Sequence, residues 1–492
     1  MALFKKILVA NRGEIACRVL RSVKRLGITS VAVYHAEDRH APHVALADEA
    51  IRLEGKVPSG AYLDGGQIIA AARASGAEAV HPGYGFLSEN AGFAASVEAA
   101  GLTFIGPEPE TIRLMGDKIR SREFAARHGI PIAPSATEDD APETFPARAA
   151  AIGFPLLIKA SAGGGGKGMK IVRSAAEFAE NAALARSEAG RYFGDARLFA
   201  ERLVERPRHI EVQILGDGAG GVVHLFEREC SLQRRYQKII EEAPAPNLAA
   251  GLREEICAAA VRLATAARYR NAGTVEFVLG ADGLFYFLEM NTRLQVEHPV
   301  TELITGIDLV EEQIRIAAGL GLSFAQGQIE QSGSAIECRI CAEEPDRDFR
   351  PATGRIAVLE PPSGEGIRFD SGIGAGQAIT PAFDSLLAKL IAHGPTRAEA
   401  AARLGHALEE MVLLGVPTNL DYLLHLVRHE AFLAGRLHTG FITQHAGDLG
   451  PPAAASPIAI AALFAAALGD KIFRDLAFGV PEPHATIGRW RN

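Results

Sequence analysis

Short apolar runs alternate with helix-like patterns along roughly the first hundred residues. Between the first two runs, apolar residues recur at helical spacing, and Gly27 ends that helix. The apolar runs, which predict strands, are 7–10, 28–34, 78–81 and 103–106. Strands separated by helices indicate a parallel, doubly wound α/β sheet. The first strand–helix turn, at 11–14, lacks the glycine pattern of dinucleotide-binding sheets, so this region gives no indication of NAD.

Strands dominate the middle of the chain, and a helix at 252–267 interrupts them. These strands are predicted at 156–159, 169–172, 209–215, 222–227, 274–279 and 285–290. After about residue 333 the pattern changes to short strands with many turns, followed by a helix near 396–414. The stretch 450–492 is rich in Ala and Pro and weakly patterned.

A glycine-rich loop follows the first strand of the middle block. Four consecutive glycines, 163–166, lie between Lys159 and Lys167, and their backbone N–H groups are free to fold over an anion. A formal G-x-G-x-x-G match starts at Gly163, but no helix follows it, as a dinucleotide site would require. A flexible hairpin is the plain alternative. The two flanking lysines favour a lid over a triphosphate.

Two carboxylates occupy a strand pair later in the middle block. If 281–282 form a two-residue loop, Glu276 lies opposite Phe287 and diagonal to Glu289, with about 7–8 Å between the Cα atoms of the two glutamates. Carboxylates at that spacing repel unless a cation lies between them, and Mg²⁺ prefers hard oxygen ligands. Asn291 adds one more such ligand two residues along the same face.

The alternation of polar and apolar residues continues beyond that strand. An extended chain would place five polar side chains on one face: Glu289, Asn291, Arg293, Gln295 and Glu297. A solvated strand face is the usual meaning of such alternation. Here the preceding strand is apolar on both faces, which predicts a buried sheet. The sequence therefore favours a site for a metal ion and an anion.

Length and composition restrict the class of protein without naming a function. The 492 residues allow about three domains, and 48% hydrophobic residues can form a large core. A formal charge of −8 gives no reason to expect nucleic acid or an anionic membrane as a partner. The apolar run at 7–10 is too short for a signal peptide, and no run reaches the ~20 residues of a membrane span. Five cysteines indicate no disulfide framework, so a soluble, cytoplasmic protein is expected.

Several longer motifs follow one another along the chain. They are His81-Pro-Gly-Tyr-Gly-Phe-Leu-Ser-Glu-Asn90, Arg113-Leu-Met-Gly-Asp-Lys118, the glycine loop, Gln233-Arg-Arg-Tyr-Gln-Lys238, Glu289-Met-Asn-Thr-Arg-Leu-Gln-Val-Glu-His298, Glu337-Cys-Arg339 and Pro351-Ala-Thr-Gly354. Together they resemble biotin carboxylases, over about residues 3–446. The resemblance implies an ATP-grasp fold with four parts: a Rossmann-like N-terminal domain at 1–113, an ATP-grasp domain at 114–333 with a mobile lid at about 132–204, a biotin carboxylase C-terminal domain at 334–446, and an Ala/Pro-rich tail or linker at 447–492.

Enzymes of this family use MgATP and bicarbonate to carboxylate biotin at N1 through carboxyphosphate, and the resemblance places that chemistry on matching residues. ATP would be bound by Lys118, Lys159, Gly164, Gly165, Gly166, Glu201, Val204, His209, Gln233, Glu276 and Glu289. Mg²⁺ or Mn²⁺ would be bound by Glu276, Glu289 and Asn291, and bicarbonate by Lys238, Arg293, Gln295 and the Val296 backbone. Glu297 would be the base, and Arg339 would stabilise the biotin enolate with Tyr84 beside the ureido ring.

Some alternatives remain at this point. Position 236 is Tyr where many relatives have His or Asn, so altered nucleotide packing is expected. Plain explanations for individual residues are a solvated Lys118, a solvated strand face formed by His209, Glu211 and Gln213, and a structural pairing of Arg339 with Glu337 or Glu343. Two other functions are another ATP-grasp ligase, which joins a carboxylate to an amine, and a non-catalytic nucleotide-binding subunit.

The sequence also bears on partners. Biotin-carrying domains present a lysine between two methionines, and no two of the five methionines flank a lysine here. We therefore expect a biotin carboxyl carrier and a carboxyltransferase on separate chains or domains. The segments 415–442 and 488–491 resemble the α subunits of acyl-CoA carboxylases of acetyl-, propionyl- or methylcrotonyl-type. Because the family commonly forms dimers, a homodimer or larger complex is expected.

Overall fold

The computed structural model describes residues 3–138, 142–161 and 169–450. By compactness the chain divides into two units, Met1–Leu449 and Gly450–Asn492, and all elements described below belong to the first. Among the described residues, no helix is both long enough and apolar enough to cross a membrane.

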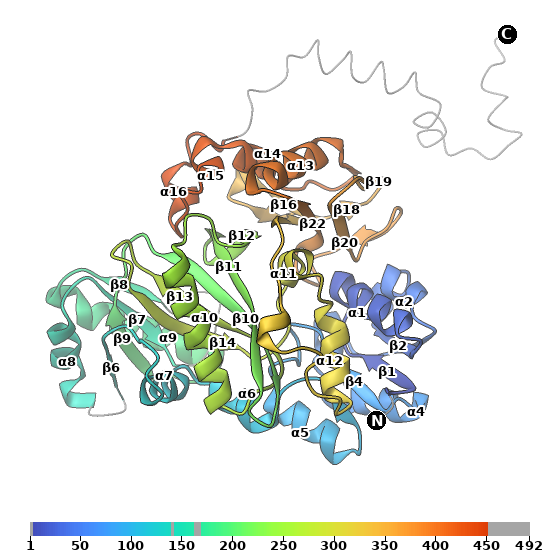
Figure 1. The fold of residues 1–492 in the computed structure, drawn as a ribbon, viewed down its shortest axis with the longest axis horizontal. Coiled ribbons are helices and arrows are strands. Elements are labelled where there is room, and N and C mark those ends of the chain that lie inside the picture. The colour runs from blue at the N-terminus through green and yellow to red at the C-terminus, as the bar shows by residue number, and fades with distance from the viewer. Residues whose placement is uncertain (1–2, 139–141, 162–168, 451–492) are drawn as a thin grey trace, which may run out of the picture. The chain divides into compact units, whose positions relative to one another are not determined.

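Five parallel strands form the N-terminal sheet, in the order β3-β2-β1-β4-β5. The strands are β1 (Lys6–Val9), β2 (Thr29–Tyr34), β3 (Glu49–Arg52), β4 (Ala79–His81) and β5 (Thr103–Phe104). The helices of this region are α1 (Gly13–Arg25), α2 (Pro42–Leu46), α3 (Pro58–Tyr62), α4 (Gly65–Ser75), α5 (Ala91–Ala99), α6 (Pro109–Gly116) and α7 (Lys118–Arg127), with the sheet drawn in blue in Figure 1. The predicted parallel α/β sheet is confirmed. Strand β3 escaped prediction because its residues are mostly exposed and form no apolar run.

Four short antiparallel strands form a second sheet, in the order β6-β9-β7-β8. The strands are β6 (Ser135–Thr137), β7 (Leu156–Ala160), β8 (Lys170–Val172) and β9 (Leu198–Arg202), and helices α8 (Phe145–Ile152) and α9 (Ala175–Phe193) pack against them. A small core that includes Phe145, Leu156 and Ile158 holds this sheet to its helices. This packed sheet carries Lys159 on β7 and Glu201 on β9.

An eight-stranded antiparallel sheet joins the middle block of the chain to the third block. Its order is β14-β13-β10-β11-β12-β15-β22-β20, and β12 pairs with β15. The strands are β10 (Arg208–Asp217), β11 (Val222–Arg234), β12 (Gln237–Ala243), β13 (Arg270–Leu279), β14 (Phe285–Asn291), β15 (Ser334–Cys341), β20 (Ile367–Ser371) and β22 (Leu386–Gly394). Strands β12, β15 and β22 contribute to one apolar core, and β10, β13 and β14 contribute to another.

Helices and short strand pairs complete this part of the fold. Helix α10 covers β10 and β11, α11 covers β12, β15 and β22, and α13 packs on β22 and α14 (Figure 1). The helices are α10 (Ala250–Ala266), α11 (His298–Thr305), α12 (Leu309–Ala317), α13 (Arg397–Glu410), α14 (Leu420–Arg428), α15 (Glu430–Leu433) and α16 (Phe441–Gln444). The strand pairs are β16 (Glu343–Glu344) with β17 (Arg350–Pro351), β18 (Gly354–Arg355) with β21 (Ala378–Ile379), and β19 (Val358–Glu360) with β23 (Val412–Leu414).

The β13–β14 hairpin differs in register from the prediction. Leu279 pairs with Phe285, so the loop is 280–284 rather than the two residues 281–282. A bulge then adds one residue to β14, because Phe277 pairs with Phe287 whereas Glu276 pairs with Glu289. The predicted pairing of Glu276 with Phe287 is therefore wrong. The two glutamates face each other directly, and cross-strand partners share a face of the sheet.

Candidate active site

One large cavity collects every sequence-predicted site residue that the structure describes. Its volume is about 1120 Å³, and the N-terminal segment, the four-stranded sheet and the eight-stranded sheet all contribute to its walls. The predicted residues that line it are Tyr84, Lys118, Lys159, Glu201, Val204, His209, Gln233, Lys238, Glu276, Glu289, Asn291, Arg293, Gln295, Val296, Glu297 and Arg339. Gly164, Gly165 and Gly166 lie outside the described residues.

Lys238, near the start of β12, is the centre of the charge network in this cavity. Its Nζ lies 2.5 Å from Glu211 Oε2, 2.8 Å from Glu276 Oε1 and 2.6 Å from Glu297 Oε1. Burial lowers the pKa of Lys238, but the three carboxylates outweigh burial and raise it well above its usual value. The ammonium group is therefore charged at neutral pH.

Glu297 lies between two cations at the N-terminus of α11. Besides Lys238, it meets Arg339 on β15, whose Nη2 is 2.9 Å from Glu297 Oε2. Burial raises the pKa of Glu297, but Lys238, Arg339 and Arg228 together hold it well below its usual range. Arg339 also donates through Nε to Glu241 Oε1 at 2.7 Å. Among the described residues its partners are thus Glu241 and Glu297, and the alternative pairing with Glu337 or Glu343 is wrong.

Arg228 on β11 forms a buried floor beneath these groups. Its fully buried guanidinium donates to Glu211 (Nε–Oε1 2.5 Å) and to Gln295 (Nη2–Oε1 2.8 Å), and Gln295 donates onward to Glu276 (Nε2–Oε1 2.8 Å). Sequence reasoning missed Arg228 because it lies just beyond the predicted strand 222–227 and belongs to no motif. The alternative of a solvated strand face is wrong, because its three members are all buried: His209, Glu211 and Gln213.

The carboxylate pair lies on the neighbouring strands β13 and β14, and β14 is an edge strand of the sheet. Asn291 donates to Glu276 (Nδ2–Oε1 2.9 Å), and His209 Nε2 lies 2.9 Å from the other oxygen of Glu276. Burial raises the pKa of Glu276, but Lys238 and His209 lower it well below its usual value. Glu276, Glu289 and Asn291 thus offer carboxylate and amide oxygens on one face, which is the donor chemistry that Mg²⁺ and Mn²⁺ prefer.

A second group of cations lies toward the four-stranded sheet. Lys159 and Arg122 both form ion pairs with the buried carboxylate of Glu201, Arg122 at 2.9 Å. Burial lowers the pKa of Lys159, whereas for Glu201 the two cations outweigh burial and the pKa falls. Lys118, at the start of α7, is 3.3 Å from Glu289 Oε2 and lines the cavity, so its side chain belongs to the site rather than to an open surface.

The chain between β14 and α11 is not the extended row that alternation predicted. Strand β14 ends at Asn291, and 292–297 turn into α11. Arg293 consequently reaches sideways to Glu89, with Nε 2.9 Å from Oε2, and donates through Nη2 to Asn291 Oδ1 at 3.0 Å. The turn still directs these polar groups into one cavity, because side chains from 293, 295 and 297 all line it.

Two further residues that sequence reasoning missed, Lys389 and Glu14, connect two segments of the cavity wall. Lys389 on β22 is fully buried, donates to the Val296 carbonyl at 2.7 Å and lies 3.5 Å from Glu14 Oε2. Glu14, in the first turn of α1, accepts a hydrogen bond from the Tyr84 hydroxyl. This chain of contacts fixes Tyr84 and Val296 relative to each other although they come from distant segments.

Tyr236 lies at the tip of the β11–β12 hairpin. Arg234 pairs with Gln237, so Arg235 and Tyr236 form a two-residue loop with φ of 49° and 67°. Residues other than glycine and asparagine rarely adopt this left-handed backbone conformation. The Tyr236 side chain is 55% exposed and lines the cavity, so it is free to contact a ligand there.

Comparison with known proteins agrees with this geometry. The family described as "Biotin carboxylase, N-terminal domain" matches residues 3–112, "Carbamoyl-phosphate synthase L chain, ATP binding domain" matches 117–325, and "Biotin carboxylase C-terminal domain" matches 337–444. A biotin carboxylase of Nostoc is 50% identical over 446 residues, which are 90% of this chain and 99% of the relative. The chain belongs to the biotin carboxylase family. The ATP-grasp fold and the family predicted from the motifs are thereby confirmed.

Two other relatives connect the biotin carboxylase fold to larger carboxylases. The methylcrotonoyl-CoA carboxylase α subunit of Glycine max is 49% identical over 90% of this chain, which spans 61% of that subunit. A crystal structure of the biotin carboxylase domain dimer of Hydrogenobacter thermophilus 2-oxoglutarate carboxylase, in complex with MgADP, ADP and bicarbonate, is 46% identical. It matches 92% of this chain and 100% of its own with a TM-score of 0.89.

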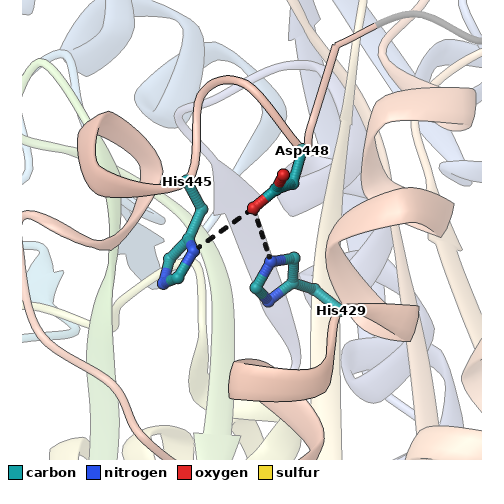
Figure 2. Close-up of side chains that lie close together, drawn as sticks. All are labelled: His429, His445 and Asp448. Carbon is teal, nitrogen blue, oxygen red and sulfur yellow. Dashed lines mark ion pairs between the residues drawn. The ribbon is translucent and has the colours of Figure 1, made fainter.

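A histidine cluster outside the biotin carboxylase site does not fit a metal ion. Figure 2 shows His429 and His445 facing Asp448, with ring nitrogens 3.6 and 3.8 Å from its Oδ2. His429 Nδ1 accepts a hydrogen bond from the Ala431 N–H at the start of α15. The proton of the neutral ring is therefore on Nε2, the atom that faces Asp448, so its lone pair is not available to a metal.

Proposed function

We propose that the chain catalyses the ATP- and bicarbonate-dependent carboxylation of biotin at N1. One observation carries this proposal: Glu297, Lys238 and Arg339 meet at one end of a cavity, and a carboxylate pair with two lysines lies further along it. The first group suits a small anion and its deprotonation, and the second suits a nucleoside triphosphate. The Hydrogenobacter relative, whose structure holds MgADP and bicarbonate, supports the assignment.

We propose that the nucleotide lies along the wall formed by β7, β9 and α7. Lys118 and Lys159 would hold phosphate oxygens, and binding would exchange their present partners, Glu289 and Glu201, for the ligand. Val204, His209 and Gln233 would line the rest of the nucleotide site. Glu276, Glu289 and Asn291 would hold Mg²⁺ or Mn²⁺, which neutralises charge on the transferred phosphoryl group.

Glu297 would remove the bicarbonate proton, and the surrounding cations explain when it becomes a base. In the free protein Lys238 and Arg339 pair with its carboxylate and make it a weak base. A bicarbonate anion held by Lys238, Arg293, Gln295 and the Val296 backbone would compete for those cations. As the cations turn to the substrate, the pKa of Glu297 rises and proton transfer becomes favourable. The base is thus strengthened by binding of its own substrate.

We propose that biotin enters beside Tyr84 and Arg339, which both line the cavity. A guanidinium group there would stabilise negative charge on the ureido oxygen once N1 loses its proton. A carrier domain or protein would deliver the biotin, and a carboxyltransferase would consume carboxybiotin. We also propose a homodimer, because the Hydrogenobacter biotin carboxylase domain is a dimer in its crystal structure. The cytoplasmic location stays a prediction.

The final acceptor is proposed only as a class. The motifs near the C-terminus favour an acyl-CoA carboxylase, in line with the methylcrotonoyl-CoA relative. A relative that serves 2-oxoglutarate is almost as similar, at 46% against 49% identity. The acceptor is bound by the carboxyltransferase, so residues of this site do not choose it.

Measurement of ADP release with each substrate omitted in turn tests the proposal. ATP cleavage should rise strongly when bicarbonate and free biotin are both present and stay low when either is missing. A rate of ATP cleavage that is the same with and without bicarbonate and biotin would contradict the proposal. Cleavage that needs an amine and a carboxylate instead would indicate another ATP-grasp ligase.

A further inference from the structure

Two buried glutamates behind Arg339 have no role in the steps above. Glu241 on β12 and Glu337 on β15 are direct cross-strand partners, and both are fully buried. The Cβ atoms of direct cross-strand partners in an antiparallel pair lie about 4.5–5.5 Å apart. Two buried carboxyl groups on such neighbouring positions, on a face that α11 covers, cannot both be ionised without a large cost in free energy.

The two carboxyl groups differ in their contacts. Glu241 Oε1 accepts a hydrogen bond from Arg339 Nε and forms an ion pair with Arg339 Nη2, so it holds one edge of the guanidinium. Its other oxygen, and both oxygens of Glu337, have no hydrogen-bond partner among the residues that the structure describes. A fully buried carboxylate with no partner is far costlier than a neutral carboxyl. The negative charge therefore belongs to Glu241, where the arginine is, and the proton to Glu337.

We propose that Glu241 and Glu337 form a carboxyl pair that holds one proton and positions Arg339 for biotin. The ionised Glu241 holds the Nε–Nη2 edge of the guanidinium, and Arg339 lines the cavity. Neutral Glu337 packs beside Glu241 on the neighbouring strand and, being uncharged, does not compete with Glu241 for Arg339. This proposal rests on the proposed function, because it gives Glu241 a positioning role for the residue that would contact biotin.

The surrounding charges support a pair that titrates near neutral pH. Burial raises the pKa of Glu241 to about 7, with Arg339 opposing the rise and Glu297 adding to it. Burial also raises the pKa of Glu337 well above its usual value, although Lys389 on β22 opposes it. Lys238 lies on β12 itself, and His298 of α11 is uncharged because burial lowers its pKa. Protonation of the pair as a unit would release the guanidinium edge.

Two isosteric substitutions on opposite strands separate this role from simple packing. Glu241→Gln keeps the shape but removes the charge that holds Arg339, so kcat/KM for biotin should fall about 10- to 100-fold while KM for ATP stays within about twofold. Glu337→Gln replaces a neutral carboxyl by a neutral amide, so kcat/KM for biotin should stay within about twofold. In the wild type, kcat/KM for biotin at fixed, saturating bicarbonate should fall below about pH 7, and Glu241→Gln should remove that dependence.

A measurement independent of turnover completes the test. The infrared difference spectrum between wild type and Glu337→Gln at neutral pH should contain the band of a protonated carboxyl group. A carboxylate band in its place would overturn the proposal, as would equal losses of kcat/KM in the two variants or an unchanged pH profile in Glu241→Gln. If Glu241→Gln does not fold, the infrared spectrum and the wild-type pH profile still decide. Wild-type protein without biotin-dependent turnover would instead contradict the proposed function.

Discussion

Lys238 brings three carboxylates of different function to one point. Glu211 is part of the buried floor, Glu276 faces the carboxylate pair, and Glu297 faces the proposed bicarbonate site. Removing three carboxylates from water is costly, and one ammonium cannot balance them alone. Arg228 and Arg339 supply the remaining positive charge. The cluster is therefore stable because its positive and negative charges balance each other, and each charged group shifts the pKa of its neighbours.

Substitution of Lys238 should destabilise the fold as well as the chemistry. Lys238→Met leaves buried carboxylates uncompensated, so the free energy of unfolding at neutral pH should fall by about 3–5 kcal/mol. Protonation of those carboxylates relieves the repulsion, so the loss should shrink as pH falls. Lys170→Met is a matched control, because its ammonium pairs with Glu188 at the surface and should contribute under about 1 kcal/mol. Thermal unfolding of the two variants at several pH values measures these losses. Equal losses in Lys238→Met and Lys170→Met would contradict a stabilising role of Lys238 in the charge cluster.

Substitution of Glu297 should separate nucleotide binding from carboxylation. Glu297→Gln preserves shape but cannot accept the proton, so biotin carboxylation should fall by about 10²–10⁴-fold with ADP affinity nearly unchanged. Because the pKa of Glu297 is held well below neutrality in the free protein, this residue should add no acid limb to the pH profile near neutrality. Product formation and ADP titration measure the two effects. Unchanged carboxylation would refute the assigned base.

The individual site residues were predictable where motifs fixed them, and the partners that position them were not. Glu297, Arg293 and Arg339 stand in longer motifs, and all three line the cavity. Glu211 follows the same alternation that a solvated strand face would show, and only burial tells the two apart. Glu241 and Lys389 act through contacts with residues that are far away in the sequence, Arg339 and Val296, and no local pattern encodes such contacts.

At the scale of elements, the hairpin of β13 and β14 shows what alternation can and cannot predict. The strands were found because apolar residues mark them, but their register depends on the loop length and on a bulge. Each of these shifts the pairing by one residue. Together they place Glu276 directly opposite Glu289, closer than the predicted diagonal. The bulge thus brings the two carboxylates directly opposite each other, where the proposed metal site would use them.

The contact between the end of β20 and the start of α1 should tolerate no side chain at Gly372. A Cβ there would lie 2.2 Å from the Glu14 backbone nitrogen, so Gly372→Ala must push α1 away. We expect a loss of about 1–3 kcal/mol in stability, and a raised KM for biotin because Glu14 holds Tyr84. Gly374→Ala is the control, since its nearest atom is 3.8 Å away. Equal melting temperatures and KM values in the two variants would contradict this packing.

At the scale of the whole molecule, one cavity is built from segments that three family profiles match separately. The sequence suggested about three blocks, but it gave no sign that β12 pairs with β15 and continues one sheet between blocks. Non-local strand pairing has no local signature, so the continuity appears only in the structure. As a result, Arg339 on β15 and Lys238 on β12 are placed by the same rigid sheet.

Nucleotide binding should therefore raise the free energy of unfolding of the protein, and Mg²⁺ should increase that stabilisation. MgADP at about 100 times its Kd should add about 2.7 kcal/mol to the free energy of unfolding. ADP with a chelator should add less, because Glu276 and Glu289 then repel the phosphates instead of sharing a cation with them. Thermal unfolding with MgCl₂ alone is the control. Equal stabilisation with and without the chelator would contradict a metal site at the carboxylate pair.

The most direct test of the proposed activity follows the transfer of the bicarbonate carbon to biotin. The protein is incubated with ATP, Mg²⁺, biotin and ¹³C-labelled bicarbonate, and carboxybiotin and ADP are quantified together. The proposed function predicts label on biotin N1 in step with ADP release, and its loss in Glu297→Gln. ADP release without labelled biotin, or labelling that persists in Glu297→Gln, would contradict it.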